Sequence, residues 1–383
     1  MTRFDQRAST ASSLTMGAVN THITTSAKSC PAQPLVPARQ PHRRGVRALL
    51  RAAFAAVAAV AAVAALCAPA EGVPLASGPL TAAQQRQILE QIDAVGRRGF
   101  LYEVVRPGAA GAASNKLFLY GTIHLGRVGS EPFNGPLLTA LRQSKRLALE
   151  ADPTDTARTQ ALALQLGRYG DGDRLQSHVS PALMARVRAF GEKSGMPIDQ
   201  VGRFKPWLLA NMVALNEMNG AGLDPALGSE LYLSGFARGL RMPIVEVEGL
   251  EAQLRMLAAL PDALQTAQLE EALSDVDSNE AQNDGKTLFD LWLRGDGSAC
   301  AALVDEMHRD DGTKVFERYF IKALIDQRNR TMADKAESYL GQPGNTFFAV
   351  GSLHLFGDAG LIREFERRGY RVVDLQPALV AGP

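Results

Sequence analysis

The sequence predicts an α/β protein with a central mixed β-sheet, two strands that end in Gly-x-x-His, and a large helical insertion. Three observations lead to this prediction. Short apolar runs alternate with helical patterns, as they do in α/β folds. One motif occurs twice, from Gly121 to His124 and from Gly351 to His354. Between these copies the chain is mostly helical, from about residue 156 to about residue 340.

The elements follow in order from local patterns. An amphipathic helix is expected at about 81–96, and a β-hairpin at 100–105 and 116–120, because two apolar runs flank a Gly-rich loop. A helix at 136–143 and a strand at 146–150 come next, and the last residue of that strand is the acidic Glu150. One strand, 243–247, interrupts the helical insertion. A long helix at 314–339, a strand at 346–350, a helix at 359–368 and a strand at 370–375 complete the fold.

The composition is that of a globular protein that can bury a large core. The chain has 383 residues, 46% of them hydrophobic, with 41 basic and 40 acidic side chains. Neither charge is concentrated after the first fifty residues, which excludes a nucleic-acid-binding surface. Cys300 is the one cysteine after residue 70, so no intrachain disulfide is expected there, and we interpret Cys300 as a small buried residue.

The N-terminal part has the layout of an export signal. Residues 1–42 lack hydrophobic periodicity and are interpreted as disordered or as a misassigned start. Residues 43–70 place several arginines before an uncharged Ala/Val stretch, which is typical of a signal peptide. Cleavage after Ala70 would release a periplasmic protein, whereas a retained segment would tether it to the inner membrane. The folded part is expected to be one domain over residues 73–383, with a helical subdomain at about 156–340.

The repeated strand end predicts a site. A Gly at the end of a strand permits a sharp turn and a close approach of other groups, and the rim at the carboxyl ends of strands is where open α/β sheets bind ligands. We therefore expect His124, His354 and Glu150 to meet at one edge. Two imidazoles and a carboxylate are a usual ligand set for zinc, manganese, cobalt or iron, which would activate water for hydrolysis. The simpler alternatives are hydrogen-bonding histidines and a capping or surface carboxylate.

At these residues the chain resembles the TraB/GumN family, whose members share two Gly-x-x-His motifs. The resemblance spans the mature chain and includes four further segments: Lys205 to Trp207, Gly222 to Asp224, Val247-Glu248 with Gln253 beyond, and Arg328 to Arg330. It implies a metal-dependent hydrolase related to the Tiki metalloproteases, with a peptide or another small molecule as substrate. The implied fold is also that of erythromycin esterases and haem-binding ChaN proteins, so a non-catalytic haem or metal binder is the alternative.

The resemblance also implies roles for individual residues. His124, His354 and Glu150 would hold the metal, and Glu150 and Arg328 would act in catalysis. Substrate-binding roles would fall to a second set of residues, Arg330, Asn329 and Lys205.

Side-chain chemistry and helix geometry limit the roles that these residues can have. Arg328 and Arg330 are permanent cations that suit a carboxylate or developing negative charge, although a basic helix surface is the alternative. Neighbours on a helix point in different directions, so at most part of this trio reaches the site. Lys205 and Trp207 frame a helix start, and Asp224 caps a short helix. Two further acidic residues, Glu246 and Glu248, lie two apart on a strand and so face the same side; they are interpreted as a solvated strand face, with a second acidic cluster as the alternative. His178 is interpreted as a loop residue and His308 as a solvated helix end.

Overall fold

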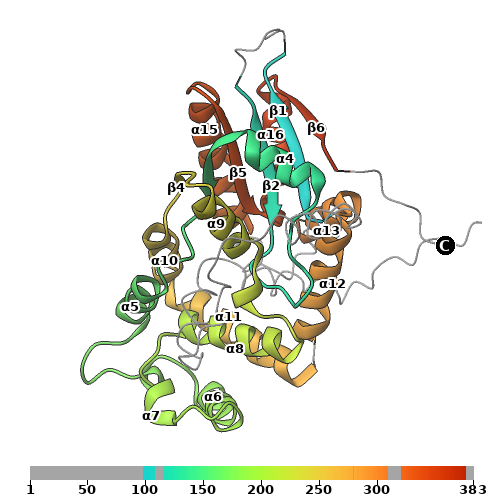
Figure 1. Cartoon of the computed structure of the whole chain (residues 1–383). Coiled ribbons are helices and arrows are strands. Elements are labelled where there is room, and N and C mark those ends of the chain that lie inside the picture. Colours follow the sequence, from blue (N-terminus) through green and yellow to red (C-terminus); the bar gives the residue numbers. More distant parts are fainter. Residues whose placement is uncertain (1–97, 108–114, 279, 309–320, 377–383) are drawn as a thin grey trace, which may run out of the picture. The chain divides into compact units, whose positions relative to one another are not determined.

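A computed structural model describes residues 98–107, 115–278, 280–308 and 321–376 (Figure 1). The expected N-terminal extension, the signal segment at 43–70 and the amphipathic helix at 81–96 lie outside the described residues. Among the residues that are described, no helix combines the length and the apolar character needed to cross a membrane.

The core of the fold is a six-stranded mixed sheet with the strand order β4-β3-β5-β2-β1-β6. Strands β2, β5, β3 and β4 run parallel, and β1 is antiparallel to both β2 and β6. This arrangement confirms the predicted α/β class and the predicted hairpin. The strands are β1 (Phe100–Val105), β2 (Leu117–Thr122), β3 (Ser144–Leu149), β4 (Ile244–Glu246), β5 (Asn345–Gly351) and β6 (Arg371–Asp374).

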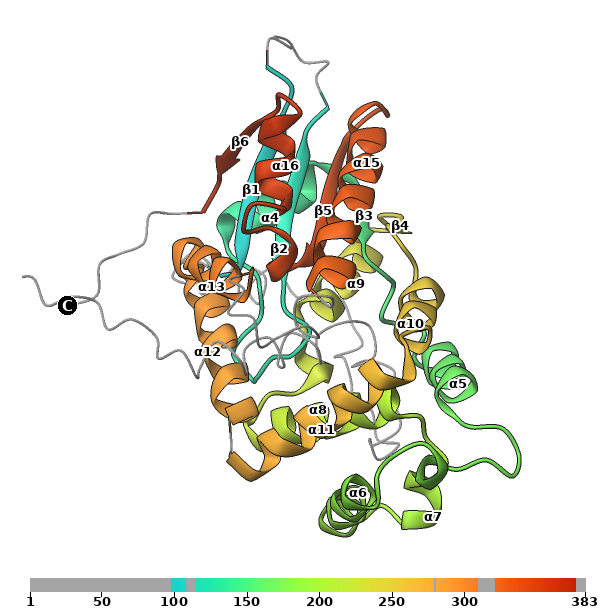
Figure 2. The same ribbon diagram turned by 180° about the vertical axis from the view of Figure 1, so that it is seen from behind.

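The central strands are apolar because both of their faces are covered. All six residues of β2 are buried, and five of the seven in β5 are buried as well. Such continuous apolar runs are expected of parallel strands that carry helices on both sides. Helices α4 (Gly135–Gln143) and α9 (Ser229–Gly239) contact β3 on one face, while α15 (Gln327–Leu340) contacts β5 on the other (Figures 1 and 2). Helix α16 (Leu361–Arg367) lies on the α15 side and contacts β6.

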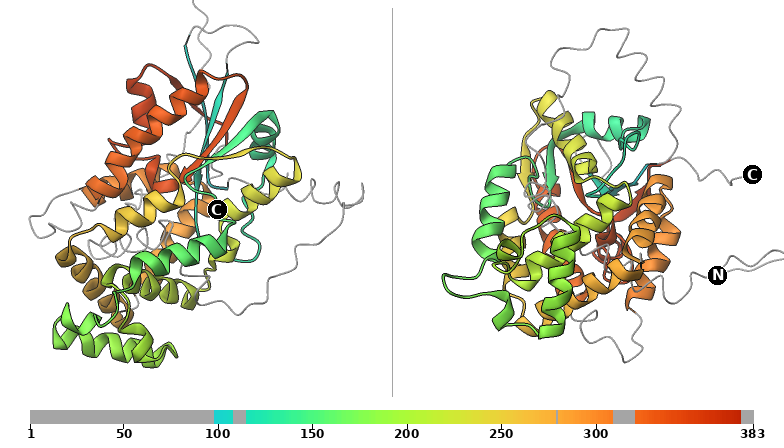
Figure 3. Two further views of the ribbon diagram at one scale, coloured as in Figure 1. Left: turned by 90° about the vertical axis from the view of Figure 1, so that its left-hand side faces the viewer. Right: turned by 90° about the horizontal axis from the view of Figure 1, so that it is seen from below.

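The insertion forms a helical layer next to the carboxyl edge of the sheet. Its main helices, α8 (Pro206–Gly220) and α11 (Asp262–Ser278), pack along each other below the strand ends in Figure 1 and in the left-hand view of Figure 3. Helix α8 is buried on nearly all sides, which explains its lack of an amphipathic pattern. The remaining elements are α5 (Thr156–Gly167), η1 (Leu175–Ser177), α6 (Pro181–Lys193), α7 (Ile198–Val201), α8 (Pro206–Gly220), η2 (Pro225–Leu227), α10 (Leu250–Ala258), α11 (Asp262–Ser278), α12 (Glu280–Arg294) and α13 (Gly297–His308).

Two short turns replace regular structure close to the strand ends. A π-helical turn, η3 (Lys322–Asp326), precedes α15, so the predicted long helix is not one uniform α-helix over its described part. A 3-10 turn, η4 (Ser352–His354), follows β5 directly. Single π-turns often occur at functional sites because they shift the side chains that follow them.

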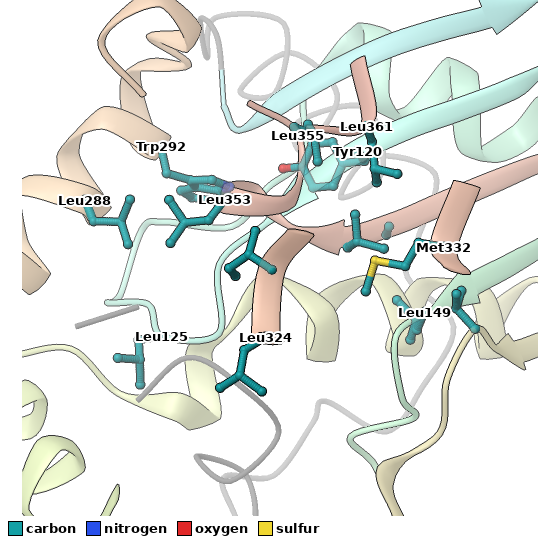
Figure 4. Packing of buried hydrophobic residues seen from close by; sticks show 14 of the residues in the cluster. Tyr120, Leu125, Leu149, Leu288, Trp292, Leu324, Met332, Leu353, Leu355 and Leu361 are labelled. Atoms are coloured by element: carbon teal, nitrogen blue, oxygen red, sulfur yellow. The ribbon is translucent and has the colours of Figure 1, made fainter. Parts of the chain in front are cut away.

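The hydrophobic core reaches the end of β2. Trp292 is buried, and its indole Nε1 donates a 2.9 Å hydrogen bond to the carbonyl oxygen of Gly121. Figure 4 shows Trp292, Leu353 and Tyr120 within this packing. Cys300 is free and fully buried, as predicted. The first Gly-x-x-His turn therefore packs against buried hydrophobic side chains.

Candidate functional site

Three predicted site residues follow three neighbouring parallel strands. In the pairing of β2 with β5, Thr122 lies opposite Gly351, and Leu149 of β3 lies opposite Ala349 of β5. His124 comes two residues after β2, Glu150 comes directly after β3, and His354 lies in the turn after β5. Because the strands are parallel, all three side chains leave the same edge of the sheet.

The backbone of Gly351 marks the point where these side chains converge. A Cβ atom placed on Gly351 would lie 3.3 Å from Glu150 Oε1, 3.6 Å from His354 Cδ2 and 3.8 Å from His124 Nε2. The absence of a side chain at Gly351 therefore leaves room between the two imidazoles and the carboxylate. The structure brings the predicted trio together.

Glu150 lies in a buried network of charged and amide groups. Arg328 Nη2 is 2.5 Å from Glu150 Oε2 and 2.6 Å from Glu248 Oε2. Gln253 Nε2 donates to both carboxylates at 3.0 Å, and the Gly351 backbone N–H donates to Glu150 Oε1 at 2.6 Å. Burial alone would raise the pKa of Glu150, but Arg328, the two histidines and the Gly351 N–H outweigh it and lower that pKa to about 2.

His354 is buried and held by an amide. Its Nδ1 lies 2.6 Å from Asn329 Oδ1, and its Nε2 lies 3.7 Å from Glu150 Oε1, which is too long for a hydrogen bond. Burial, with a further contribution from the Arg328 cation, lowers the pKa of His354 to about 3 despite the nearby carboxylate. The ring is therefore neutral at physiological pH.

His124 is held by a carboxylate that the sequence did not predict. Its Nδ1 lies 2.6 Å from Oε1 of Glu230, in the first turn of α9. Burial opposes the charged form of His124, but Glu230 outweighs it and raises the pKa of the ring. Burial likewise opposes ionisation of Glu230, and His124 outweighs it and lowers the pKa of that carboxyl group. A Glu in the first turn of a helix commonly interacts with the helix dipole, so its sequence position gave no functional signal.

Comparison with known proteins now assigns the family. The model of the TraB/PrgY/gumN family matches residues 109–374. The chain belongs to the TraB/PrgY/gumN family. Two relatives, each called "Uncharacterized protein YbaP", come from Escherichia coli K12 and Shigella flexneri. Each is 25% identical over 247 residues, which cover 63% of this chain and 85% of the relative. No solved structure gives a significant match.

In this TraB/PrgY/gumN member, the predicted Arg-Asn-Arg segment divides between the site and the surface. Arg328 and Asn329 are buried and contact different partners, Glu150 and His354. The alternative of a basic helix surface is wrong for Arg328. Arg330 is exposed. Lys205 precedes α8, and its backbone N–H donates to the Gly167 carbonyl at 2.7 Å. Substrate-binding roles for Arg330, Asn329 and Lys205 remain predictions.

The interpretation of Glu248 as part of a solvated strand face is wrong. Glu248 does not belong to a solvated strand face, because β4 ends at Glu246 and Glu248 turns to Arg328 with bonds of 2.9 Å and 2.6 Å. Glu246 is exposed, as predicted. The positive φ of Gly249, 93°, helps to turn the chain at this point.

The remaining predicted residues have structural positions. Asp224 accepts a 2.7 Å hydrogen bond from the Ala226 N–H and caps the short turn η2. His178 lies before α6 and pairs with Asp173 at 2.8 Å. His308 ends α13 and pairs with Asp326 at 3.1 Å. These observations confirm the cap at Asp224, the loop position of His178 and the helix-end position of His308.

Proposed function

We propose that this protein is an exported metal-dependent hydrolase, in the first place a peptidase, and that His124, His354 and Glu150 hold its metal ion. The observation that carries the proposal is the convergence of both imidazoles and the carboxylate around Gly351. Family membership supports a shared scaffold and leaves the chemistry open.

The donor set fits a transition-metal ion. Within the described residues, no group of three or more His, Cys, Asp or Glu side chains is arranged so that it could hold a metal ion as it stands, so the proposal rests on donor chemistry. Nδ1 of each ring already lies against an acceptor, Glu230 or Asn329. Histidine ligands of metal ions almost always donate their second ring N–H to such an acceptor, which leaves Nε2 for the metal.

The surrounding residues support a role for Glu150 in binding rather than in proton transfer. A carboxyl group with a pKa of about 2 stays ionised at neutral pH, which suits a ligand and makes it a weak general base. Arg328 spans Glu150 and Glu248 and so fixes the orientation of the first carboxylate. We therefore propose that Arg328 acts by holding Glu150. Zinc, manganese, cobalt or iron, when bound, would lower the pKa of water to about 7 and polarise a substrate carbonyl.

The substrate and the compartment are proposed from the sequence. The resemblance to the Tiki metalloproteases supports a peptide substrate, with another small molecule as the broader class. The signal-like residues 43–70 support export to the periplasm, either as a released protein or with a tether to the inner membrane. Exposed Arg330 and the start of α8 at Lys205 remain the proposed places for substrate contacts.

The test is metal-dependent peptide cleavage by single-site variants. We expect His124→Ala and His354→Ala each to abolish the release of new amino termini, measured by mass spectrometry of a peptide mixture with each of the four metals. His178→Ala and His308→Ala are matched controls and should retain activity, because both side chains pair with other residues. Unchanged activity in both site variants would contradict the proposal. A Soret band that depends on His354, without any cleavage, would favour the haem-binding alternative.

A further inference from the structure

The two histidines share a feature that the strand-end motifs do not explain. In both rings Nδ1 is in contact with a buried oxygen acceptor, at 2.6 Å in each case. The acceptors come from different parts of the fold, Glu230 from α9 on one face of the sheet and Asn329 from α15 on the other. Two unrelated elements thus supply an oxygen acceptor to the same ring atom.

The amide at His354 has a defined orientation. Asn329 Nδ2 donates a 2.8 Å hydrogen bond to the carbonyl oxygen of Ala359, and a carbonyl can only accept. The amide nitrogen must therefore face Ala359, so the amide oxygen faces His354. Because that oxygen can only accept, Nδ1 of His354 must carry the hydrogen.

The carboxylate at His124 gives the same result. Nδ1 of His124 lies 2.6 Å from Oε1 of Glu230 in an ion-pair contact, and an ionised carboxylate can only accept, so this contact favours the hydrogen on Nδ1. The backbone on which Glu230 stands is fixed against the histidine turn: Ser229 Oγ accepts from the Ile123 N–H at 2.8 Å, and the Ser229 N–H donates to the Ile123 carbonyl at 2.9 Å. A Cβ on Gly228 would lie 2.4 Å from the His124 carbonyl oxygen, so only glycine permits this approach.

We infer that Glu230 and Asn329 are a matched pair of positioning residues that keep the hydrogen on Nδ1 of His124 and His354 and turn both Nε2 atoms toward Glu150. The use of these Nε2 atoms as ligands rests on the proposed function, whereas the position of the hydrogens does not. Neutral imidazole in water prefers the other tautomer, with the hydrogen on Nε2. The pair therefore imposes the form that leaves Nε2 with its lone pair.

The hydrogen positions are measured directly by long-range 1H–15N NMR on the full chain with 15N-labelled histidine, at a pH where the rings are neutral. We expect pyrrole-type shifts at Nδ1 and pyridine-type shifts at Nε2 for His124 and His354. Glu230→Ala should shift His124 toward the Nε2–H tautomer, and Asn329→Ala should do so for His354. Glu230→Gln keeps an acceptor and should restore the wild-type pattern. Glu251→Ala removes an exposed glutamate and is the control.

A second measurement reports the consequence for ligand binding. Cobalt titration should show about 10- to 100-fold weaker affinity for Glu230→Ala and Asn329→Ala, the loss that follows removal of acceptors behind metal-bound histidines. Glu230→Gln should recover most of this loss, which a merely structural role of Glu230 would not predict. The unfolding temperature of each variant, measured in parallel, distinguishes a loss of stability from a loss of cobalt affinity.

The outcomes distinguish this inference from the proposed function. Wild-type shifts with the hydrogen on Nε2 of His124 or His354 overturn the inference, even if the alanine variants do not fold. Unchanged shifts in both alanine variants overturn it as well. The expected shift changes in a chain that binds no cobalt and cleaves no peptide support the inference and contradict the proposed function.

Discussion

Gly351 and Gly121 occupy equivalent positions in the two strand-end motifs, yet substitution by alanine should impair a different property of the protein at each position. A Cβ on Gly351 projects between the predicted ligands, whereas a Cβ on Gly121 would meet Phe100, Leu355 and Ser352 at 3.0–3.1 Å. The first position borders the site and the second borders the core. Gly351→Ala should therefore impair metal binding, and Gly121→Ala should impair stability.

The magnitudes follow from these contacts. Gly351 has φ −52° and ψ 138°, a conformation that alanine adopts without strain. Replacing glycine by alanine stabilises the folded protein by about 0.4–1 kcal/mol, because the unfolded chain loses conformational entropy. The tight 3.3 Å contact with Glu150 opposes this gain, so the free energy of unfolding should change by less than about 1 kcal/mol. Gly121→Ala overpacks a closed core and should cost about 1–3 kcal/mol.

Metal binding should respond in the reverse order. An ion bound to nitrogen and oxygen ligands lies about 2.0–2.2 Å from each of them, and the new methyl group on residue 351 would stand 3.3–3.8 Å from atoms of the same three side chains. We expect Gly351→Ala to lower cobalt affinity at least about 10-fold, comparable to the loss of a group behind a ligand. Gly121→Ala should keep the affinity of its folded fraction.

The assay combines urea unfolding with cobalt titration on both variants. Wild-type cobalt affinity in Gly351→Ala would refute the placement of the ion among these three side chains. A stability loss in Gly351→Ala equal to that of Gly121→Ala would refute the distinction between an open site and a closed core.

Two further predictions concern charge in the buried network. The pKa of His354 is about 3, below the usual 6.5. Between these two pH values the imidazole is protonated in the unfolded chain and neutral in the folded protein. In metal-free protein, His354 should therefore contribute a loss of stability as pH falls from about 6.5 toward about 3, with about 2 kcal/mol lost near pH 5, whereas His124, whose pKa is raised, contributes in the opposite direction. His354→Gln should remove this contribution from the pH profile of urea unfolding, and an unchanged profile would contradict the assignment. The loss from Glu150 becomes large only below its unfolded pKa of 4.5. Arg328→Met leaves the carboxylates of Glu150 and Glu248 without their cation and should cost about 3–5 kcal/mol in thermal unfolding. Arg328→Lys should not restore that stability, because an ammonium group lacks the planar fork that spans both acids, and full rescue by lysine would contradict this reading.

The sequence predicted those parts of the fold that local patterns determine. The hairpin, β3, β5 and the last strand were predicted to within a few residues, because each is a short apolar run bounded by turn residues. The convergence of His124, Glu150 and His354 was predicted because parallel strands bring their carboxyl ends to one edge. Helical spacing predicted that only part of the trio 328–330 reaches the site, and Arg328 and Asn329 do so whereas Arg330 is exposed.

The partners of the site residues were not predictable from local sequence. The contact of Glu230 with His124 depends on how α9 docks against the turn after β2, which Gly228 and Ser229 permit through long-range contacts. Glu248 was misinterpreted because strand alternation holds only while the strand continues, and β4 ends two residues earlier. Both cases depend on tertiary packing, which the periodicity of the sequence does not predict.

Metal content tests the central claim most directly. The full-length protein, reconstituted with manganese, cobalt, zinc or iron and exchanged into metal-free buffer, should retain about one ion per chain by elemental mass spectrometry. The double variant His124→Ala/His354→Ala should retain none while keeping its circular dichroism spectrum. Equal metal content in both proteins, or none in the wild-type protein with any of the four metals, would contradict the account.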